Sequence, residues 1–472
     1  MPSGSLSQRK DVLLEVLGVA LALMLLVGSF YLTGAPYLAL GIAIGGLVVV
    51  WACMKPKRLV YVLIIWCCLY PYLESDLGMP RLLSYGGDLI NILAFLFSLR
   101  SKKPRAVKWG WVPVPIALFG LVALLSAIMH GVSPLLMLWE VRNVFRFFAF
   151  FLVCICLLDT EDLKKIVKLI LAVFVVNLVL CSFESLVLHY GQDNTNGLFG
   201  SGSGGNAATD VLLLTMSCLA VFGYGRKAMD LPLVVFIIAG SCWISIIAEL
   251  KFYFIQLALL IAVYLVVSKP SLKNLFLAVL LMAGLYEAVQ LFYLFMPSWK
   301  EFFDLQTILK SSSDGGYGSN EGLNRLSAIG TLQSMFISNA TDNLFGLGLG
   351  AGTYSQFFSA PLYAAWGETL HWTWFTDAQI YLETGYVGLA CYTAFFVVLG
   401  AHAFRLREGL EASEAALVET GGVMAFFCVL LIVYNCVLTV DPGGYLIFFF
   451  LAMPLVVDRE RRLQPREGRV IQ

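Results

Sequence analysis

The sequence is a succession of long apolar runs separated by short polar segments. A helix needs about 20 apolar residues to cross the core of a bilayer, and runs of this kind occur fourteen times. The predicted spans are residues 12–32, 36–54, 58–73, 84–99, 110–130, 136–158, 166–190, 207–225, 231–248, 252–268, 274–296, 378–402, 417–439 and 443–457. Strands of a membrane β-barrel would alternate apolar and polar positions over about ten residues. The continuous runs therefore predict an all-α, polytopic membrane helical bundle.

The positions of Lys and Arg predict how this bundle is oriented. With the N-terminus in the cytoplasm, 24 of the 31 basic residues fall in segments on the cytoplasmic side, as the positive-inside rule requires. Both termini are then cytoplasmic. Seven cations remain on the outer side, where topology does not explain them. They are Arg81, Arg142, Arg146, Lys251, Lys300, Lys310 and Arg325.

The apolar runs also divide the chain into parts. These parts are residues 1–297 with eleven spans, residues 298–377 as one large periplasmic loop, and residues 378–472 with three spans and a cytoplasmic tail. A loop this long is functional or disordered, and its Trp and Phe residues favour the first. It contains an amphipathic helix predicted from Leu323, a Gly-rich turn (Gly346 to Gly352) and an aromatic segment (Leu370 to Asp377). We expect the loop to cover the outer mouth of the bundle.

Composition narrows the class of protein further. Apolar residues make up 59% of the chain and charged residues 13%, whereas soluble domains carry about 25% charge. The net charge is zero, so no basic field attracts nucleic acid. The 11 cysteines all fall within predicted spans and the 4 histidines are scattered. We therefore expect no disulfide framework, no metal site and no cofactor.

Two of the outer cations predict an anion-binding site. Arg142 and Arg146 are four residues apart, so they share one face at the outer end of a predicted helix. Burying an Arg in a membrane costs about 2.5–3.5 kcal/mol, and a phosphate or pyrophosphate matches the guanidinium fork. The alternatives are that both side chains reach lipid headgroups or that one pairs with Glu140. For Lys251 the alternative is a local ion pair in a hairpin turn, and for Arg325 a solvated helix face.

Candidate proton acceptors lie near the start of the twelfth span. His371 and Asp377 flank this start, and Glu383 follows further along the helix. A His or a carboxylate beside the membrane surface can take a proton from a hydroxyl group. The alternative for His371 is a hydrogen-bonded residue within an aromatic patch.

Five segments, taken in order, resemble the O-antigen ligase/polymerase superfamily. They are GLFGSGSGGNAATDVLLL with Asn206, AELKFYF with Lys251 where the family usually has Arg, LNRLSAIG with Arg325, GLGLGAGTYSQF, and YLETGYVGL with Glu383. The resemblance covers roughly residues 135 to 400. Ligases of the family carry His-Asn eleven residues before the Gly of the last motif, where this chain has Trp374-Phe375. This difference favours a polymerase.

The resemblance implies a fold like that of the C-type glycosyltransferases and a location in the bacterial inner membrane. The implied activity is polymerisation of undecaprenyl-pyrophosphate-linked oligosaccharide repeat units of O-antigen or exopolysaccharide on the periplasmic face, without a metal and with inversion. One alternative is an O-antigen ligase that transfers the glycan to lipid A core or to protein. The other is a transporter of polysaccharide or lipid-linked sugar that forms no bond. Implied partners are the lipid-linked saccharide, the lipid bilayer, a flippase and a chain-length regulator, and no nucleic acid.

Residue roles follow as predictions. The pyrophosphate would be held by Arg142, Arg146, Lys251 and Arg325, whose positive charge stabilises the leaving group. His371 or Asp377 would orient or deprotonate the acceptor hydroxyl, with Arg325 assisting catalysis. The sugar would contact Asn206, Trp372, Trp374 and Glu383.

Overall fold

The computed structural model of the chain describes residues 36–202, 204–300, 302–316 and 322–463. Within these ranges every regular element is a helix and none is a strand, which confirms the all-α prediction. The first predicted span, residues 12–32, lies outside the described residues.

Each of the other thirteen predicted spans coincides with a helix. These helices are α2 (Pro36–Cys53), α3 (Lys57–Ser75), α4 (Tyr85–Ser98), α5 (Pro113–Met129), α6 (Pro134–Leu157), α7 (Thr160–Leu186), α8 (Gly205–Gly225), α9 (Leu231–Ile247), α10 (Lys251–Val267), α11 (Leu272–Phe295), α16 (Thr376–Leu406), α17 (Ala412–Tyr434) and α18 (Gly443–Leu463). The boundary between α9 and α10 is the predicted turn, in which Glu249 has a positive φ of 56°. The end of α17 is earlier than predicted, so Cys436 lies outside this helix.

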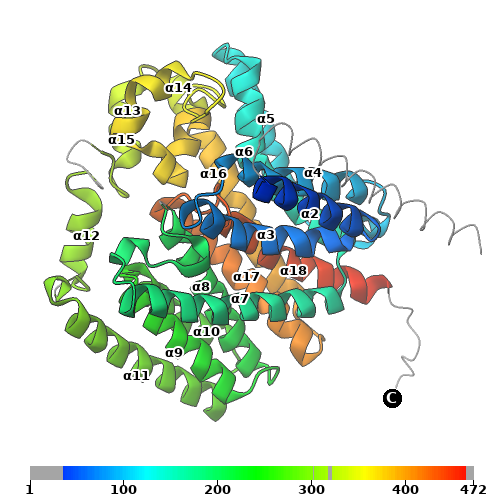
Figure 1. Cartoon of the computed structure of the whole chain (residues 1–472), viewed down its shortest axis with the longest axis vertical. Coiled ribbons are helices and arrows are strands. Elements are labelled where there is room, and N and C mark those ends of the chain that lie inside the picture. Colours follow the sequence, from blue (N-terminus) through cyan, green and yellow to red (C-terminus); the bar gives the residue numbers. More distant parts are fainter. Residues whose placement is uncertain (1–35, 203, 301, 317–321, 464–472) are drawn as a thin grey trace, which may run out of the picture.

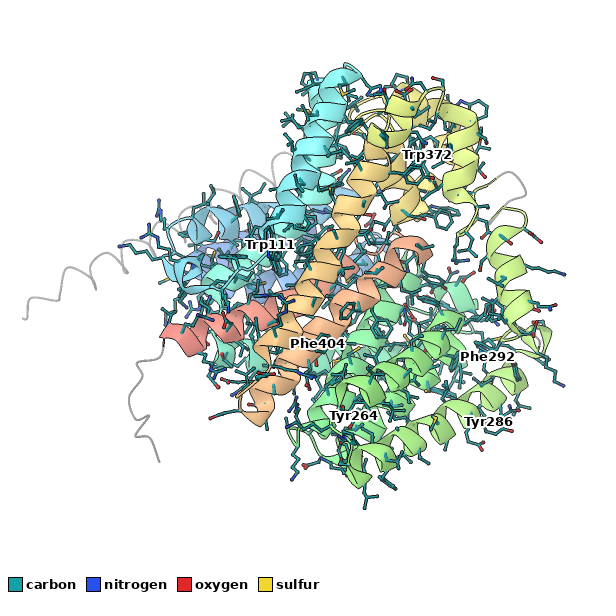
Figure 2. The ribbon with its side chains drawn as sticks, turned by 180° about the vertical axis from the view of Figure 1, so that it is seen from behind. Trp111, Tyr264, Tyr286, Phe292, Trp372 and Phe404 are labelled. Carbon is teal, nitrogen blue, oxygen red and sulfur yellow. The ribbon has the colours of Figure 1, made fainter. Side chains whose placement is uncertain are left out.

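Six of these helices, α3, α7, α8, α11, α16 and α17, are long and apolar enough to cross a membrane. On α11, Leu272 and Tyr286 are 87% and 63% exposed, and Figure 2 shows Tyr286 on the outer side of the bundle. A broad apolar surface of this kind marks contact with a membrane or a partner. The chain is therefore a helical membrane protein, and the total of fourteen spans stays a prediction.

The centre of the bundle is formed by α8, α17 and α18 (Figure 1). Every residue of α18 from Gly443 to Arg459 is buried, and α8 is buried over most of its length. A helix that is apolar on all sides must be enclosed by other helices or by lipid. Around this centre, α6 packs on α18 and α5 packs on α16.

The segments that the sequence assigns to one side of the membrane meet at one end of the bundle. Lys57 at the start of α3 pairs with Asp162 of α7 at 2.9 Å. Arg226 after α8 and Arg407 after α16 both pair with Glu419 of α17. Figure 1 shows the helices of the large loop along the opposite side of the molecule from the C-terminal end of α18. The two ends of the bundle thus carry different parts of the chain.

The large loop is folded into short helices with a core of their own. They are α12 (Leu305–Ser313), α13 (Ala328–Phe336), α14 (Ala340–Phe345), a π-helix (Tyr363–Gly367) and α15 (Glu368–Leu370). Trp372 is fully buried at the centre of this core and lies among the loop helices in Figure 2. The helix predicted from Leu323 begins only at Ala328, so Arg325 lies in the turn before α13 rather than in the helix.

Candidate functional site

A cavity of about 660 Å³ lies between the helical bundle and the large loop. The bundle contributes the end of α3, residues 139–146 of α6 and residues 436–442 between α17 and α18. The loop contributes Tyr354, Tyr363 and Trp374. Segments that are far apart in the sequence therefore meet around one space.

Arg142 and Arg146 line this cavity from one face of α6. Arg142 binds the carboxylate of Asp88 through two nitrogens, with Nε 3.0 Å from Oδ2. Arg146 lies between two carboxylates. Its Nη1 is 3.3 Å from Asp88 Oδ1 and its Nη2 is 3.4 Å from Asp441 Oδ1. The anionic partner that two partly buried arginines require is thus supplied by two aspartates of the chain itself.

Asp441 lies in the segment that joins α17 to α18 and also lines the cavity. Burial raises the pKa of its carboxyl above the ordinary value, and the Arg146 guanidinium opposes this rise. The buried Nε of Arg146 has no hydrogen-bond partner among the described residues. A buried N–H without a partner costs about 1–3 kcal/mol, so a polar ligand that reaches this nitrogen would stabilise the site.

Aromatic rings surround the charged part of the cavity. The Arg142 guanidinium lies 5.2 Å and 5.1 Å from the ring centres of Tyr85 and Trp139, within the range of cation–π contact. Tyr354 and Tyr363 form another aromatic pair, with ring centres 5.3 Å apart. The cavity therefore offers positive charge and flat amphipathic surfaces together.

The Gly-rich turn, Gly346–Gly352, packs directly on α16. The backbone of α16 leaves the helical conformation at Gly385 (φ 64°, ψ −170°), and the freed carbonyl of Glu383 accepts a hydrogen bond from Gly348 N at 3.1 Å. The Glu383 side chain is buried and accepts a hydrogen bond from Gly352 N at 3.1 Å. Two of the five sequence motifs thus form one structural unit. This unit holds the residues that come after the Gly-rich turn in the sequence at the cavity wall.

Lys251 and Arg325 belong to a separate group. Lys251 Nζ lies 2.8 Å from Glu249 Oε1 and 3.0 Å from the centre of the Trp299 ring. Arg325 donates from Nε to the Tyr434 carbonyl at 3.2 Å and covers the Tyr434 ring. The two cations interact electrostatically with each other, but neither lines the cavity. For Lys251 the structure shows the local ion pair that was the alternative interpretation.

The two predicted proton acceptors do not line the cavity either. The His371 ring stacks on Trp374, with ring centres 4.0 Å apart, and Trp374 is itself a lining residue. Asp377 is buried in the first turn of α16, where its carboxylate accepts a hydrogen bond from Ala378 N at 2.8 Å. The described carboxylates that line the cavity are Glu74, Glu368 and Asp441.

Of the four residues predicted to contact sugar, Trp374 alone is among the described residues that line the cavity. Asn206 donates to Asp193 Oδ1 at 3.0 Å, although its neighbours Gly204 and Gly205 are lining residues. Trp372 donates to a backbone carbonyl of the Gly-rich turn. Trp372 and Glu383 therefore support the wall rather than face the space.

Several residues of the site received no role from the sequence. Asp88 and Asp441, which pair with the arginines, received no role, and neither did the lining residue Gln379. Arg81 was singled out as an outer cation but received no role, and it lines the cavity. Asp88 had a usable signal, because an ionisable residue inside a predicted span is costly and marks a functional site.

Within the described residues no three His, Cys, Asp or Glu side chains are arranged to hold a metal ion. Comparison with protein-family models gives no match, and no curated protein is significantly similar to the chain. Any functional conclusion therefore rests on the chemistry of the site.

Proposed function

We propose that the chain is a membrane glycosyltransferase that polymerises undecaprenyl-diphosphate-linked oligosaccharide repeat units. The observation that carries the proposal is the cavity at the loop end of the bundle, where arginines and aromatic rings line one space. Guanidinium groups suit a diphosphate, and aromatic faces suit sugar rings. A lipid-linked saccharide contains both chemical groups.

In this proposal the cavity faces the periplasm of a bacterium and the protein spans the inner membrane fourteen times. The support is the separation of charge along the bundle. The basic segments Lys55 to Arg58, Arg226-Lys227 and Arg405 to Arg407 are at one end, which the positive-inside rule assigns to the cytoplasm. Both termini are then cytoplasmic, and the loop covers the site from the periplasmic side.

The diphosphate binds beside Arg142 and Arg146, with Arg81 nearby at the cavity wall. The side chain of Arg81 is 60% exposed and lies 3.9 Å from Glu74, so it can turn toward a ligand at little cost. Arg142 and Arg146 already carry carboxylate partners, which fix them in place. Lys251 and Arg325 stay predictions as further diphosphate contacts.

The reaction exchanges one C–O bond for another and moves one proton. An acceptor sugar hydroxyl attacks the anomeric carbon of the donor, and the bond from this carbon to the diphosphate oxygen breaks on the opposite side, which inverts the configuration. The diphosphate leaves with the electron pair, and the arginines stabilise its charge. Asp441 takes the hydroxyl proton, because it is a carboxylate that lines the cavity beside Arg146. His371 and Asp377 remain the sequence-based candidates for this role.

An extension assay with purified protein and lipid-linked repeat units tests the proposal. Loss of a charge-assisted contact costs about 1.5–3 kcal/mol, so Arg142→Ala and Arg81→Ala should each lower kcat/KM by roughly 10- to 100-fold. The matched control is Lys310→Ala, which removes an exposed cation of α12 outside the cavity and should elongate normally. Wild-type rates for Arg142→Ala would contradict the proposal. A single transfer to lipid A core instead of a ladder of products would indicate the ligase.

A further inference from the structure

One wall of the cavity is built from uncharged polar side chains. Asn143 of α6, Thr353 after the Gly-rich turn and Gln379 of α16 all line the space. None of them was a candidate from the sequence. They come from three separate segments, so something must hold their polar ends in a common orientation.

Glu140 lies directly behind this wall and is 0% exposed. Its Oε1 accepts a hydrogen bond from Gln379 Nε2 at 2.8 Å, and its Oε2 accepts one from Asn143 Nδ2 at 2.9 Å. The Thr353 hydroxyl accepts a hydrogen bond from the same Asn143 Nδ2 at 3.4 Å and also interacts with this carboxylate. A single buried carboxylate therefore contacts all three members of the wall.

A carboxylate accepts hydrogen bonds and donates none when ionised, so it selects the nitrogen end of each carboxamide. For Asn143 the oxygen end is also fixed, because it accepts a hydrogen bond from Arg142 Nη1 at 2.7 Å. Because Glu140 accepts from the NH₂ group of Gln379, the carbonyl oxygen of Gln379 points away from Glu140. This side chain is 7% exposed, and the space that it faces is the cavity.

We propose that this wall is a subsite for saccharide hydroxyl groups, in which Gln379 accepts a hydroxyl hydrogen bond and Glu140 is the positioning residue that orients it. The inference rests on the proposed function and adds the part of the site that recognises the sugar. Glu140 does not take part in the reaction directly, because it has no exposed surface and its two oxygens are used by the wall.

The decisive variant is Glu140→Gln, which has one oxygen and one NH₂ group for two incoming NH₂ groups. Asn143 is held at both ends, so the Gln379 amide is the one that must turn and present its nitrogen to the cavity. Removing the acceptor for a hydroxyl should weaken binding of the lipid-linked repeat unit about tenfold. Binding of undecaprenyl diphosphate without sugar should stay within about twofold, because Arg142 keeps its contacts.

A charge swap separates positioning from stability. In Glu140→Gln/Gln379→Glu the new amide at 140 donates to the new carboxylate at 379 and still accepts from Asn143, so the hydrogen bonds to positions 379 and 143 are both restored and an oxygen again faces the cavity. Affinity for the repeat unit should recover to within about threefold of wild type. Glu419→Gln, at the other end of the bundle, removes a different buried carboxylate and should leave the ratio of the two affinities unchanged.

Binding is measured with detergent-solubilised full-length protein by quenching of tryptophan fluorescence, because Trp139 and Trp374 line the cavity. The inference is overturned if Glu140→Gln binds the repeat unit as well as wild type, if it loses both ligands equally, or if the swap restores nothing. A wild-type protein that binds neither ligand would instead contradict the proposed function.

Discussion

The charged residues of the site are paired within the chain before a ligand arrives. Arg142 and Arg146 hold Asp88 and Asp441, so each arginine keeps a fixed orientation at the cavity wall. Removing one member of a fully buried ion pair costs about 3–5 kcal/mol, because the other charge is left without compensation. These partly buried pairs should cost less. Truncation of one of these side chains therefore changes stability as well as binding, so the rate of Arg142→Ala is compared with its thermal stability. A variant that keeps the shape of the side chain perturbs the fold less.

Asp441→Asn is such a variant. If Asp441 accepts the proton of the acceptor hydroxyl, this substitution should lower kcat by about 10²–10⁴, while the fold and lipid binding persist. Burial raises the pKa of Asp441 above its ordinary value, and only the ionised carboxylate accepts a proton. In the wild type kcat/KM should therefore fall as the pH falls through this raised pKa, whereas the residual activity of Asp441→Asn should show no such fall over the same range. If Glu368→Gln removes the pH dependence instead, the assignment to Asp441 is wrong.

The sequence could indicate which charged side chains are costly to place in a membrane but not which way they face. Arg142 and Arg146 were identified because charge is expensive in an apolar helix, and both line the cavity. Lys251 was predicted to hold the diphosphate because it is a cation on the outer side within one of the family-like segments, yet it pairs with Glu249 two residues away. Packing between segments that are distant in the sequence determines which side chains at a helix end face a cavity. A local sequence pattern does not predict this packing.

At the scale of elements, the helices follow from the apolar runs, whereas their interruptions depend on tertiary contacts. The turn before α13 is an example. Asn324 donates to the carbonyls of Ser311 and Asp314 and accepts from Arg325 N, which ties the chain down before the helix starts. The break in α16 is another example, because Gly385 adopts a positive φ where the Gly-rich turn meets the helix.

Gly385→Ala tests the importance of this break. A Cβ atom at Gly385 would overlap the backbone of Leu344 and Phe345, which cannot rotate away, and the positive φ adds strain. The substitution should destabilise the protein by more than about 3 kcal/mol and separate the turn from α16. Gly330→Ala in α13 is the control, because a Cβ there meets nothing within 4 Å and should stabilise the helix by about 0.5–1 kcal/mol. Equal thermal stability of the two variants in detergent would contradict this account.

At the scale of the whole molecule, the bundle has two chemically distinct ends. At one end, ion pairs such as Arg226–Glu419 hold the helix ends together. The other end carries the folded loop and the cavity. A catalytic site for membrane-bound substrates needs this asymmetry, because the lipid part stays in the bilayer while the sugar part reaches water. The orientation of the two ends is therefore the property on which the proposed function depends most.

Cys436 provides a native probe of that orientation. It lines the cavity beyond the end of α17, and burial raises the pKa of its thiol to about 11. Its reaction with a membrane-impermeant thiol reagent should therefore be slow at neutral pH and faster as the pH rises. In intact spheroplasts the reagent should reach Cys436 from outside, and undecaprenyl diphosphate should protect it by occupying the cavity.

The control for this labelling is Lys269→Cys in a Cys436→Ser background. Lys269 is exposed between α10 and α11, on the end assigned to the cytoplasm, so the new thiol should react only after the membrane is permeabilised. The reverse pattern, with position 269 labelled in intact spheroplasts and Cys436 only after permeabilisation, would place the cavity in the cytoplasm. Periplasmic polymerisation of lipid-linked repeat units is impossible from that side, because neither the donor sugar nor the acceptor hydroxyl would reach the arginines.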